Sequence, residues 1–180
     1  ILNARNMSKL VELKNELTEM YNVRIHLLPF DVRDRNLVTN AIQSLPDEWK
    51  DIDILINNAG LVIGVDKEFE GNLDEWDIVI DTNVKGLLAM TRLVVPGMLK
   101  RGSGHVINIG SIAGEAAYPG GSVYCATKAA VRILTDGLRI DLVDTPLRVT
   151  NIKPGMVETN FSVVRYRGDQ QTADDFYKGI

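Results

Sequence analysis

Short apolar runs alternate with longer helical patterns along this chain, and this alternation restricts its fold more than any other feature. A strand, a helix and another strand in succession imply a right-handed crossover, which builds a parallel sheet with helices on both faces. The apolar runs are nearly continuous, as expected for strands covered on both sides. The sequence therefore predicts an α/β fold with a doubly wound parallel sheet. The runs typical of strands are residues 1–4, 23–30, 51–60, 104–111 and 147–155.

Helical patterns fill the intervals between these runs. They cover residues 8–20, 33–45, 73–102 and 122–143. The third is the longest, and it contains Pro96, which should kink the helix or mark a local break because proline lacks a backbone N–H. We expect residues 1–180 to form a single domain, since 180 residues that are 45% hydrophobic supply one well-buried core.

Polar or glycine-rich residues follow the strands of the predicted sheet. In open α/β sheets, ligands bind in the crevice outside the carboxyl ends of the strands. Five separate segments should therefore meet at one edge of the sheet and form one ligand site. They are Arg5, Asp31, the turn at 57–60, Ser111 and the segment that begins at Pro154.

Tyr124 and Lys128 stand four positions apart in the last helical pattern, so both side chains should lie on one helical face. A phenol with a pKa near 10 is a poor acid–base catalyst at neutral pH. A neighbouring ammonium group stabilises the phenolate and should lower that pKa, and Ser111 could hydrogen-bond a substrate oxygen. The alternative is an ordinary surface pair, which a tyrosine and a lysine at this spacing often form by chance.

The order of several motifs decides between these two interpretations. The turn Asn57-Asn58-Ala59-Gly60, the helical Asn83, the strand-end Ser111 and the pair Tyr124 and Lys128 occur in this order and precede Pro154-Gly155 and Thr159. In these motifs the sequence resembles the short-chain dehydrogenases/reductases along essentially its whole length. The resemblance implies a Rossmann-type fold and a hydride transfer to or from a nicotinamide cofactor.

The resemblance also implies a role for each catalytic position. Tyr124 would be the general acid/base, and Ser111 would orient the substrate oxygen. Lys128 would hold the nicotinamide ribose and lower the pKa of the tyrosine, and Asn83 would anchor a water that relays protons to Lys128. An asparagine within a helix is more often a backbone-bonding or exposed residue, but within this set we favour the functional role.

The remaining matched positions would bind the cofactor. Asp31 would contact the adenine, although it could equally be the N-cap of the next helix. The turn after the third apolar run would line the cofactor channel, and the segment after the fifth would meet the nicotinamide. The residues of these two groups are Asn58, Ala59 and Gly60, and Gly155, Val157 and Thr159.

Arg5 favours NADP over NAD as the cofactor. The free ribose 2′-hydroxyl of NAD is usually met by an acid at the end of the second strand, where this chain has Ala4 followed by Arg5. An arginine suits a 2′-phosphate through charge-assisted hydrogen bonds. The alternative is an exposed arginine that starts a loop, and Asn6 stands where many NADP-type relatives have a second basic residue.

A narrower resemblance concerns the substrate. Residues 109–128 and 154–169, together with 45–60, look like the fungal form of the branch that acts on 3-hydroxy acids, serine and allo-threonine with NADP. A carboxylate substrate needs a cation nearby, and Arg165 lies just past the nicotinamide-side motif, where a lid would fold over the site. We expect either a carboxylate clamp or a solvated lid arginine at this position.

Composition excludes several other classes of function. The formal net charge is −4 and no run of lysines and arginines stands out, which argues against a nucleic-acid partner. No apolar stretch is long enough to span a bilayer. Cys125 is the only cysteine, and His26 and His105 have no paired ligands, so we expect neither disulfides nor a metal site. A reducing, cytoplasmic setting fits best.

The chain departs from the family at its ends. The glycine-rich T-G-x-x-x-G-x-G motif, whose backbone would cradle the pyrophosphate, is absent, and the last strand and helix of the family have no counterpart. We therefore expect a sheet incomplete at both ends, from an interior fragment of a longer chain or from a naturally short relative. Such a piece would expose strand edges and be poorly soluble.

Three functions stay open at this point. The first is an NADP-dependent oxidoreductase that acts on a small 3-hydroxy acid. The second is a dinucleotide-sensing pseudoenzyme, which would not need a phenol of tuned pKa. The third is an inactive fragment, favoured by the missing glycine loop. The resemblance also implies a homo-tetramer, built on the helix near 74–101 and the helix of Tyr124.

Overall fold

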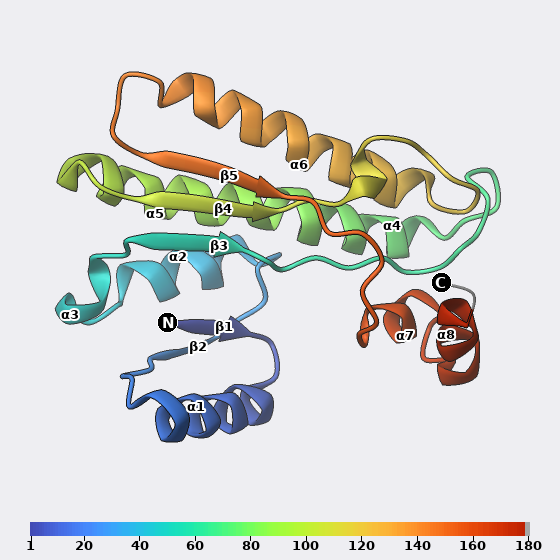
Figure 1. Ribbon diagram of the computed structural model, residues 1–180, viewed down its shortest axis with the longest axis horizontal. Helices are drawn as coiled ribbons and strands as arrows, with labels where there is room; N and C mark the ends of the chain where they lie inside the picture. Colours follow the sequence, from blue (N-terminus) through green and yellow to red (C-terminus); the bar gives the residue numbers. More distant parts are fainter. Residues whose placement is uncertain (179–180) are drawn as a thin grey trace.

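The computed structural model describes residues 1–178 and places the strands in two parallel sheets flanked by helices (Figure 1). In the smaller sheet, β1 (Leu2–Ala4) pairs with β2 (Leu27–Pro29). The larger sheet has the order β3-β4-β5, formed by Ile54–Asn57, His105–Ile109 and Arg148–Ile152. The predicted class, an α/β fold with parallel strands, is confirmed.

The helices lie between the strands in sequence, as the alternation predicts. The short helices α3, α7 and α8 are additional to the predicted ones, because each is too short or too polar to give a clear periodic pattern. The helices are α1 (Met7–Tyr21), α2 (Arg35–Gln43), α3 (Asp47–Lys50), α4 (Leu73–Ile80), α5 (Leu87–Arg101), α6 (Ser122–Asp141), α7 (Phe161–Arg165) and α8 (Gln170–Tyr177).

Side-chain caps fix where several helices begin. The carboxylate of Asp34 accepts hydrogen bonds from the backbone N–H groups of Asn36 and Leu37, at 2.9 and 3.0 Å, and starts α2. Such a cap satisfies amides that have no partner within the helix. The interpretation of Asp31 as this N-cap is wrong, because Asp31 lies three residues earlier and binds Arg33 instead.

Between α4 and α5 the helix does not break at its proline. α5 runs through Pro96, and the irregularity lies earlier, in a π-helical turn over Asp81–Gly86. The prediction of a local break at Pro96 is therefore wrong. A π-helical turn inserts an extra residue and often marks a functional site, and this one contains Asn83.

Two hydrophobic clusters hold the layers together. Leu55, Val106 and Met98 join β3 and β4 to α5, while Phe30 and Val38 belong to a second cluster under β2 and α2. One side of β3 faces this core, and the other side carries Ile54 and Ile56, whose exposed fractions are 55% and 57%. β3 is thus buried on one face only among the residues described.

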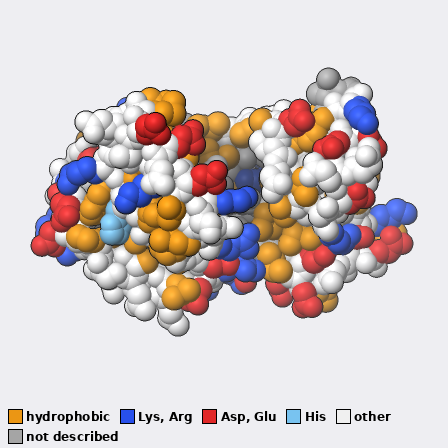
Figure 2. Space-filling model, turned by 90° about the horizontal axis from the view of Figure 1, so that it is seen from below, with side chains coloured by type: hydrophobic (Ala, Val, Ile, Leu, Met, Phe, Trp, Pro, Cys, Tyr) orange, Lys and Arg blue, Asp and Glu red, His pale blue; other side chains and the backbone are white. Residues whose placement is uncertain are grey.

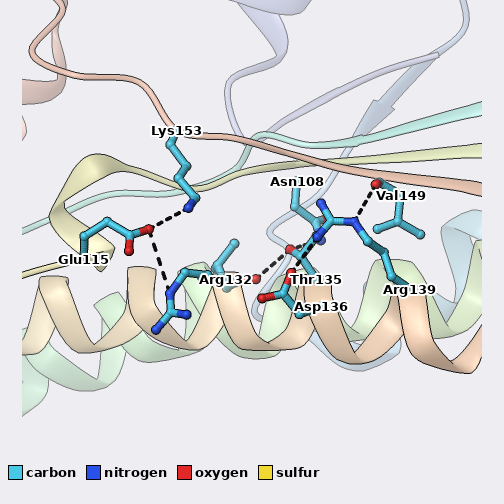
Figure 3. A network of polar contacts seen from close by, with 9 residues as sticks. Asn108, Glu115, Arg132, Thr135, Asp136, Arg139, Val149 and Lys153 are labelled. Carbon is cyan, nitrogen blue, oxygen red and sulfur yellow. Dashed lines mark hydrogen bonds and ion pairs between the residues drawn. The ribbon is translucent and has the colours of Figure 1, made fainter.

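Polar contacts fasten α6 to the sheet (Figure 3). Asn108 of β4 donates to the Thr135 hydroxyl at 2.9 Å, and the Arg139 guanidinium donates to the carbonyl oxygen of Val149 at 3.0 Å. Arg132 of α6 lies 3.9 Å from the Glu115 carboxylate, which also pairs with Lys153 after β5 at 2.6 Å. These contacts fix how α6 lies on β4 and β5, and so where its side chains reach the carboxyl ends of the strands. Among the described residues, no helix is long and apolar enough to cross a membrane.

Candidate active site

A cleft of about 1050 Å³ lies between the two sheets, where β1 and β3 face each other without pairing. Figure 2 shows the surface hollowed near its centre, with Lys and Arg side chains along the hollow. Many of the predicted cofactor-binding residues line this cleft, although they come from four distant segments. They are Arg5, Asp31, Asn58, Ala59, Gly60 and Thr159.

Tyr124 and Lys128 are both buried on one face of α6, with exposed fractions of 9% and 6%. The Lys128 Nζ atom lies 5.8 Å from the centre of the Tyr124 ring. The same atom donates a hydrogen bond of 2.8 Å to the carbonyl oxygen of Ile109, at the end of β4. The spacing therefore does bring the pair together, and it is no solvated surface pair.

Burial dominates the acid–base properties of both groups. It raises the pKa of Tyr124 above its ordinary value, and contact with the Ser111 hydroxyl opposes this increase only in part. It also lowers the pKa of Lys128 to about 8. The expected lowering of the tyrosine pKa by Lys128 is therefore wrong for the chain as described, because desolvation disfavours both charges and the ammonium group is directed to a carbonyl oxygen.

Ser111 sits where β4 ends, as predicted. Its hydroxyl accepts a hydrogen bond of 3.1 Å from the backbone N–H of Ala113 and caps a short 3₁₀ helix over Ile112–Gly114. The lone pair and proton that remain on this hydroxyl are available to a second partner. Ser111 lies near enough to Tyr124 to oppose the rise in the pKa of the phenol.

Asn83 is buried, with an exposed fraction of 2%, and its amide is fully engaged. Its Oδ1 accepts from the backbone N–H of Leu61 at 2.8 Å, and its Nδ2 donates to the Leu61 carbonyl at 2.9 Å. The Nδ2 atom also donates to the Thr127 hydroxyl at 3.0 Å, which in turn donates to the Tyr124 carbonyl at 2.7 Å. Asn83 thus ties the 58–61 turn to the helix of Tyr124.

Gly60 lies directly beside this junction. A Cβ at position 60 would approach the Asn83 Oδ1 and the Lys128 Nζ to 3.4 Å each. A side chain at position 60 would therefore crowd both polar groups, and glycine avoids this close contact.

A buried polar chain beneath the site escaped the sequence analysis. Asn57 donates to the Asn108 side chain at 2.9 Å and to the Thr91 hydroxyl at 3.1 Å. Asn108 continues the chain to Thr135 on α6. The apolar runs around Asn57 and Asn108 hid this link, although buried asparagines within strands are uncommon and could have signalled it.

At the other end of the cleft, Asp31 binds the Arg33 guanidinium through both carboxylate oxygens, with a closest distance of 2.7 Å. The hydrogen bond from Arg33 lowers the pKa of Asp31 and keeps it ionised. Arg5 is exposed on the cleft and forms no ion pair with a carboxylate among residues 1–178. This end therefore offers a free guanidinium for an anion.

The segment after β5 is the most exposed part of the predicted site. The carbonyl oxygen of Pro154 accepts from the Ile112 N–H at 3.2 Å, so Gly155 lies beside the Ser111 loop. The Val157 carbonyl accepts from the Tyr177 hydroxyl at 2.9 Å, whereas the Val157 side chain is exposed and does not line the cleft. Of Gly155, Val157 and Thr159, only Thr159 lines the cleft.

Arg165 lies in an aromatic box next to the site. Its guanidinium carbon is 5.2 Å from the Tyr118 ring centre, 5.4 Å from that of Phe176 and 5.8 Å from that of Tyr166. The Nε atom of Arg165 is buried and has no hydrogen-bond acceptor among the described residues. The box is therefore an electropositive point with unused donor capacity.

The residues described contain no group of three or more His, Cys, Asp and Glu side chains that could hold a metal ion. His105 instead shares a hydrogen bond of 2.8 Å with the Thr150 hydroxyl, and His26 packs against Trp49. Both histidines are thus involved in packing between elements.

Residues 1–169 match the family model described as short chain dehydrogenase. The chain is 48% identical over 178 residues to the NADP-dependent 3-hydroxy acid dehydrogenase of Schizosaccharomyces pombe, covering 99% of this chain and 69% of the relative. It is 47% identical over 179 residues to the NADP-dependent 3-hydroxy acid dehydrogenase of Escherichia coli K12, covering 99% and 71%. The closed form of a serine dehydrogenase complexed with NADP+ has 48% identity and a TM-score of 0.92, covering 99% and 71%.

Proposed function

This chain belongs to the short chain dehydrogenase family, and we propose that it transfers a hydride between NADP(H) and the hydroxyl-bearing carbon of a small 3-hydroxy acid. Serine, allo-threonine and 3-hydroxyisobutyrate are the substrates that fit this class. The names of its relatives at 47% and 48% identity support the reaction and the cofactor. The positions of this chain's own side chains give the proposal further support.

The cleft fits a dinucleotide phosphate. Its rim carries the free Arg5 guanidinium, which suits a 2′-phosphate, and the ionised Asp31, which suits an adenine amino group. Beside Gly60, which lines the cleft, lies Lys128, whose ammonium group uses only one of three donors on Ile109. We assign these three residues, with Asn58, Ala59, Gly60, Gly155, Val157 and Thr159, to cofactor binding. The bound NADP would take up or supply the hydride.

Tyr124 moves the proton. In the reduction direction its hydroxyl donates a proton to the substrate carbonyl oxygen and becomes a phenolate, and in the oxidation direction the phenolate accepts the proton of the alcohol. The raised pKa keeps the phenol protonated at neutral pH, as a proton donor requires. Ser111 lies near Tyr124 and would hold the substrate oxygen. Lys128, whose Nζ lies 5.8 Å from the centre of the Tyr124 ring, would hold the nicotinamide ribose.

Asn83 serves this arrangement by holding the 58–61 turn against α6. In the family the matching asparagine anchors a water on the path to the lysine. We retain that role as a proposal, with the backbone of the same turn as the second anchor.

Arg165 is our candidate for the substrate carboxylate. Aromatic faces hold its guanidinium in place at little further entropic cost. Its charge is felt at Tyr124, where it favours the phenolate. The carboxylate of a short hydroxy acid would therefore pair with Arg165 while the hydroxyl of the same molecule met Tyr124.

The observation that carries this proposal is the burial of Tyr124 and Lys128 side by side on α6, with Lys128 bonded to the carbonyl oxygen of Ile109 at the end of β4. The test is to incubate the protein with NADP and 3-hydroxyisobutyrate and to follow the absorbance of the reduced cofactor. Turnover with the acid that exceeds turnover with its methyl ester is expected. Binding of NADPH without any turnover would instead indicate a sensing protein, and neither would indicate an inactive chain.

We also propose that the protein assembles as a homo-tetramer. Ile133 and Ile140 lie seven residues apart on one face of α6 and are exposed, as is Leu88 at the start of α5. Apolar side chains in this pattern suit a two-fold contact between copies. Light scattering of the purified protein tests it, and a monomer at micromolar concentration would exclude it.

A further inference from the structure

The segment that contains α7 and α8 lies beyond the carboxyl ends of the strands and packs on the candidate site (Figure 1). The ring of Phe161, at the start of α7, is 5.7 Å from the ring of Tyr124. Arg165 closes α7 and reaches Tyr118, in the loop before α6. The position of this segment therefore decides whether Arg165 stands near Tyr124.

One arginine joins this segment to the opposite side of the site. The Arg167 guanidinium forms a paired contact with Glu75, from Nε to Oε1 and from Nη2 to Oε2, both at 2.8 Å. Its Nη2 also contacts the Asp66 carboxylate. Glu75 belongs to the first turn of α4, and Asp66 belongs to the loop before it. We name these three residues the Arg167–Glu75–Asp66 cluster.

The backbone at Arg167 is shaped for this contact. Its φ is 55°, in the left-handed region that non-glycine residues seldom adopt, and Gly168 follows with φ of 93°. The N–H groups of Arg167 and Gly168 close α7 on the carbonyl oxygens of Val164 and Val163, at 3.1 and 2.8 Å. A strained residue persists where its surroundings compensate it, and here the compensation is two carboxylates on one guanidinium.

A backbone tie runs beside the cluster. The N–H of Gly64 donates to the Arg165 carbonyl oxygen at 2.8 Å. Gly64 has φ of 78°, and a Cβ there would come within 2.6 Å of the Asp66 carboxylate and 2.7 Å of the Arg167 guanidinium. The ion contacts therefore pass directly over Gly64, and they stabilise the position of the backbone segment that carries Arg165.

An isolated surface ion pair contributes little, because solvent screens it. The Arg167–Glu75–Asp66 cluster differs in three respects. It has paired geometry, it joins segments 92 and 101 residues apart, and it leaves two carboxylates facing each other if the arginine is removed. Loss of the cluster should therefore free the segment that contains α7 and α8, and not merely the side chain at position 167.

We propose that Arg167 is a positioning residue, which acts through Arg165: the Arg167–Glu75–Asp66 cluster holds α7 so that the boxed guanidinium of Arg165 meets the carboxylate of the substrate. This inference rests on the proposed hydroxy-acid substrate. Arg167 itself contacts neither the aromatic box nor Tyr124 in any interaction of the described residues. It sets selectivity for charged substrates from outside the site.

The test compares Arg167→Met with Lys50→Met in the full chain. Lys50 is the control, because it also pairs with a carboxylate at the surface but lies on α3 and makes no contact with α7 or the candidate site among the described residues. For Arg167→Met we expect KM for 3-hydroxyisobutyrate to rise about tenfold or more. We expect kcat, and KM for the methyl ester, to change less than about threefold. Arg167→Lys should recover part of the loss, and Glu75→Gln should reproduce it.

Hydrogen exchange gives a readout that does not need turnover. Backbone amides of residues 161–177 should exchange faster in Arg167→Met, and faster in Glu75→Gln, than in the wild type or in Lys50→Met. Unchanged exchange in both variants would overturn the inference. Equal increases in KM for the acid and the ester would also overturn it, since the cluster would then not act through Arg165. A wild type that exchanges as expected but oxidises no hydroxy acid would refute the proposed function alone.

Discussion

The Nζ atom of Lys128 lies 5.8 Å from the centre of the Tyr124 ring and donates its hydrogen bond to the carbonyl oxygen of Ile109 instead. The two residues are thus neighbours through burial and not through a direct ion–phenol contact. Burial sets the pKa of each, upward for the tyrosine and downward, to about 8, for the lysine.

Lys128 should make the stability of the folded chain rise with pH. Below pH 8 the lysine is protonated in both the folded and unfolded chain, and burying the charge costs stability. As pH rises from 8 towards the ordinary value of 10.5, the folded chain loses this proton first, which relieves the cost. Relative to Lys128→Met, the wild type should gain up to about 3 kcal/mol over this window. Urea unfolding at several pH values measures it, and parallel curves for the two proteins would contradict it.

Replacing Asn83 by alanine should destabilise the protein. The change leaves the partly buried N–H and carbonyl of Leu61 without their partner, at a cost of about 2 kcal/mol. Urea unfolding of Asn83→Ala and of Asn40→Ala, an exposed asparagine on α2, provides the comparison. A loss at position 83 no larger than that at position 40 would show that the turn does not depend on this amide.

Tyr124→Phe should abolish turnover while cofactor binding survives. The ring can keep its packing on Phe161, but the proton donor is lost, which should lower kcat by about 100-fold or more. NADPH fluorescence titration and the hydroxy-acid assay separate the two effects. Tyr21→Phe, an exposed tyrosine at the end of α1, is the control. Residual activity near that of the wild type would remove Tyr124 from the mechanism.

Arg5→Ala should discriminate between the two nicotinamide cofactors. Loss of a charge-assisted contact to the 2′-phosphate should weaken NADP binding by about 10- to 100-fold and leave NAD binding unchanged. Arg35→Ala, at an exposed arginine in the first turn of α2, should change neither. A parallel loss for NADP and NAD would mean that Arg5 contacts a part that both molecules share.

Arg165→Ala should affect charged substrates selectively. Removing the boxed guanidinium should lower kcat/KM for 3-hydroxyisobutyrate by about 100-fold, and by much less for its methyl ester. Arg165→Lys, which keeps the charge but not the planar stack on Tyr118, should fall between. Equal losses on both substrates would rule out a carboxylate clamp.

The sequence was sufficient for the parts of the site that follow from regular spacing. Tyr124 and Lys128 share a face because four residues make about one helical turn, and strand ends meet because the strands are parallel. Ser111 and the turn at 57–60 lie where this reasoning expects them. Local periodicity is therefore enough to collect these groups on one edge.

Contacts between distant segments were beyond such reasoning. The π-helical turn at Asp81–Gly86 contains Asn83, whose amide bonds the distant Leu61, and no local pattern reveals this contact. The raised pKa of Tyr124 depends on how deeply α6 is buried, and spacing says nothing of depth. Asp31 and Asp34 both precede α2, and only the backbone conformation decides which of them caps it. The Arg167–Glu75–Asp66 cluster joins segments about half the chain apart and has no signature at all.

The π-helical turn also makes the number of residues between α4 and α5 important for the fold. Deleting one residue within 81–86 would allow a regular α-helix, in which every residue on the N-terminal side turns by about 100° relative to α5. Val79, now buried, would swing towards water, and Glu75 would swing away from Arg167. An insertion or deletion here should therefore be tolerated far less readily than most substitutions, because the number of residues at this point fixes the rotation of α4 relative to α5.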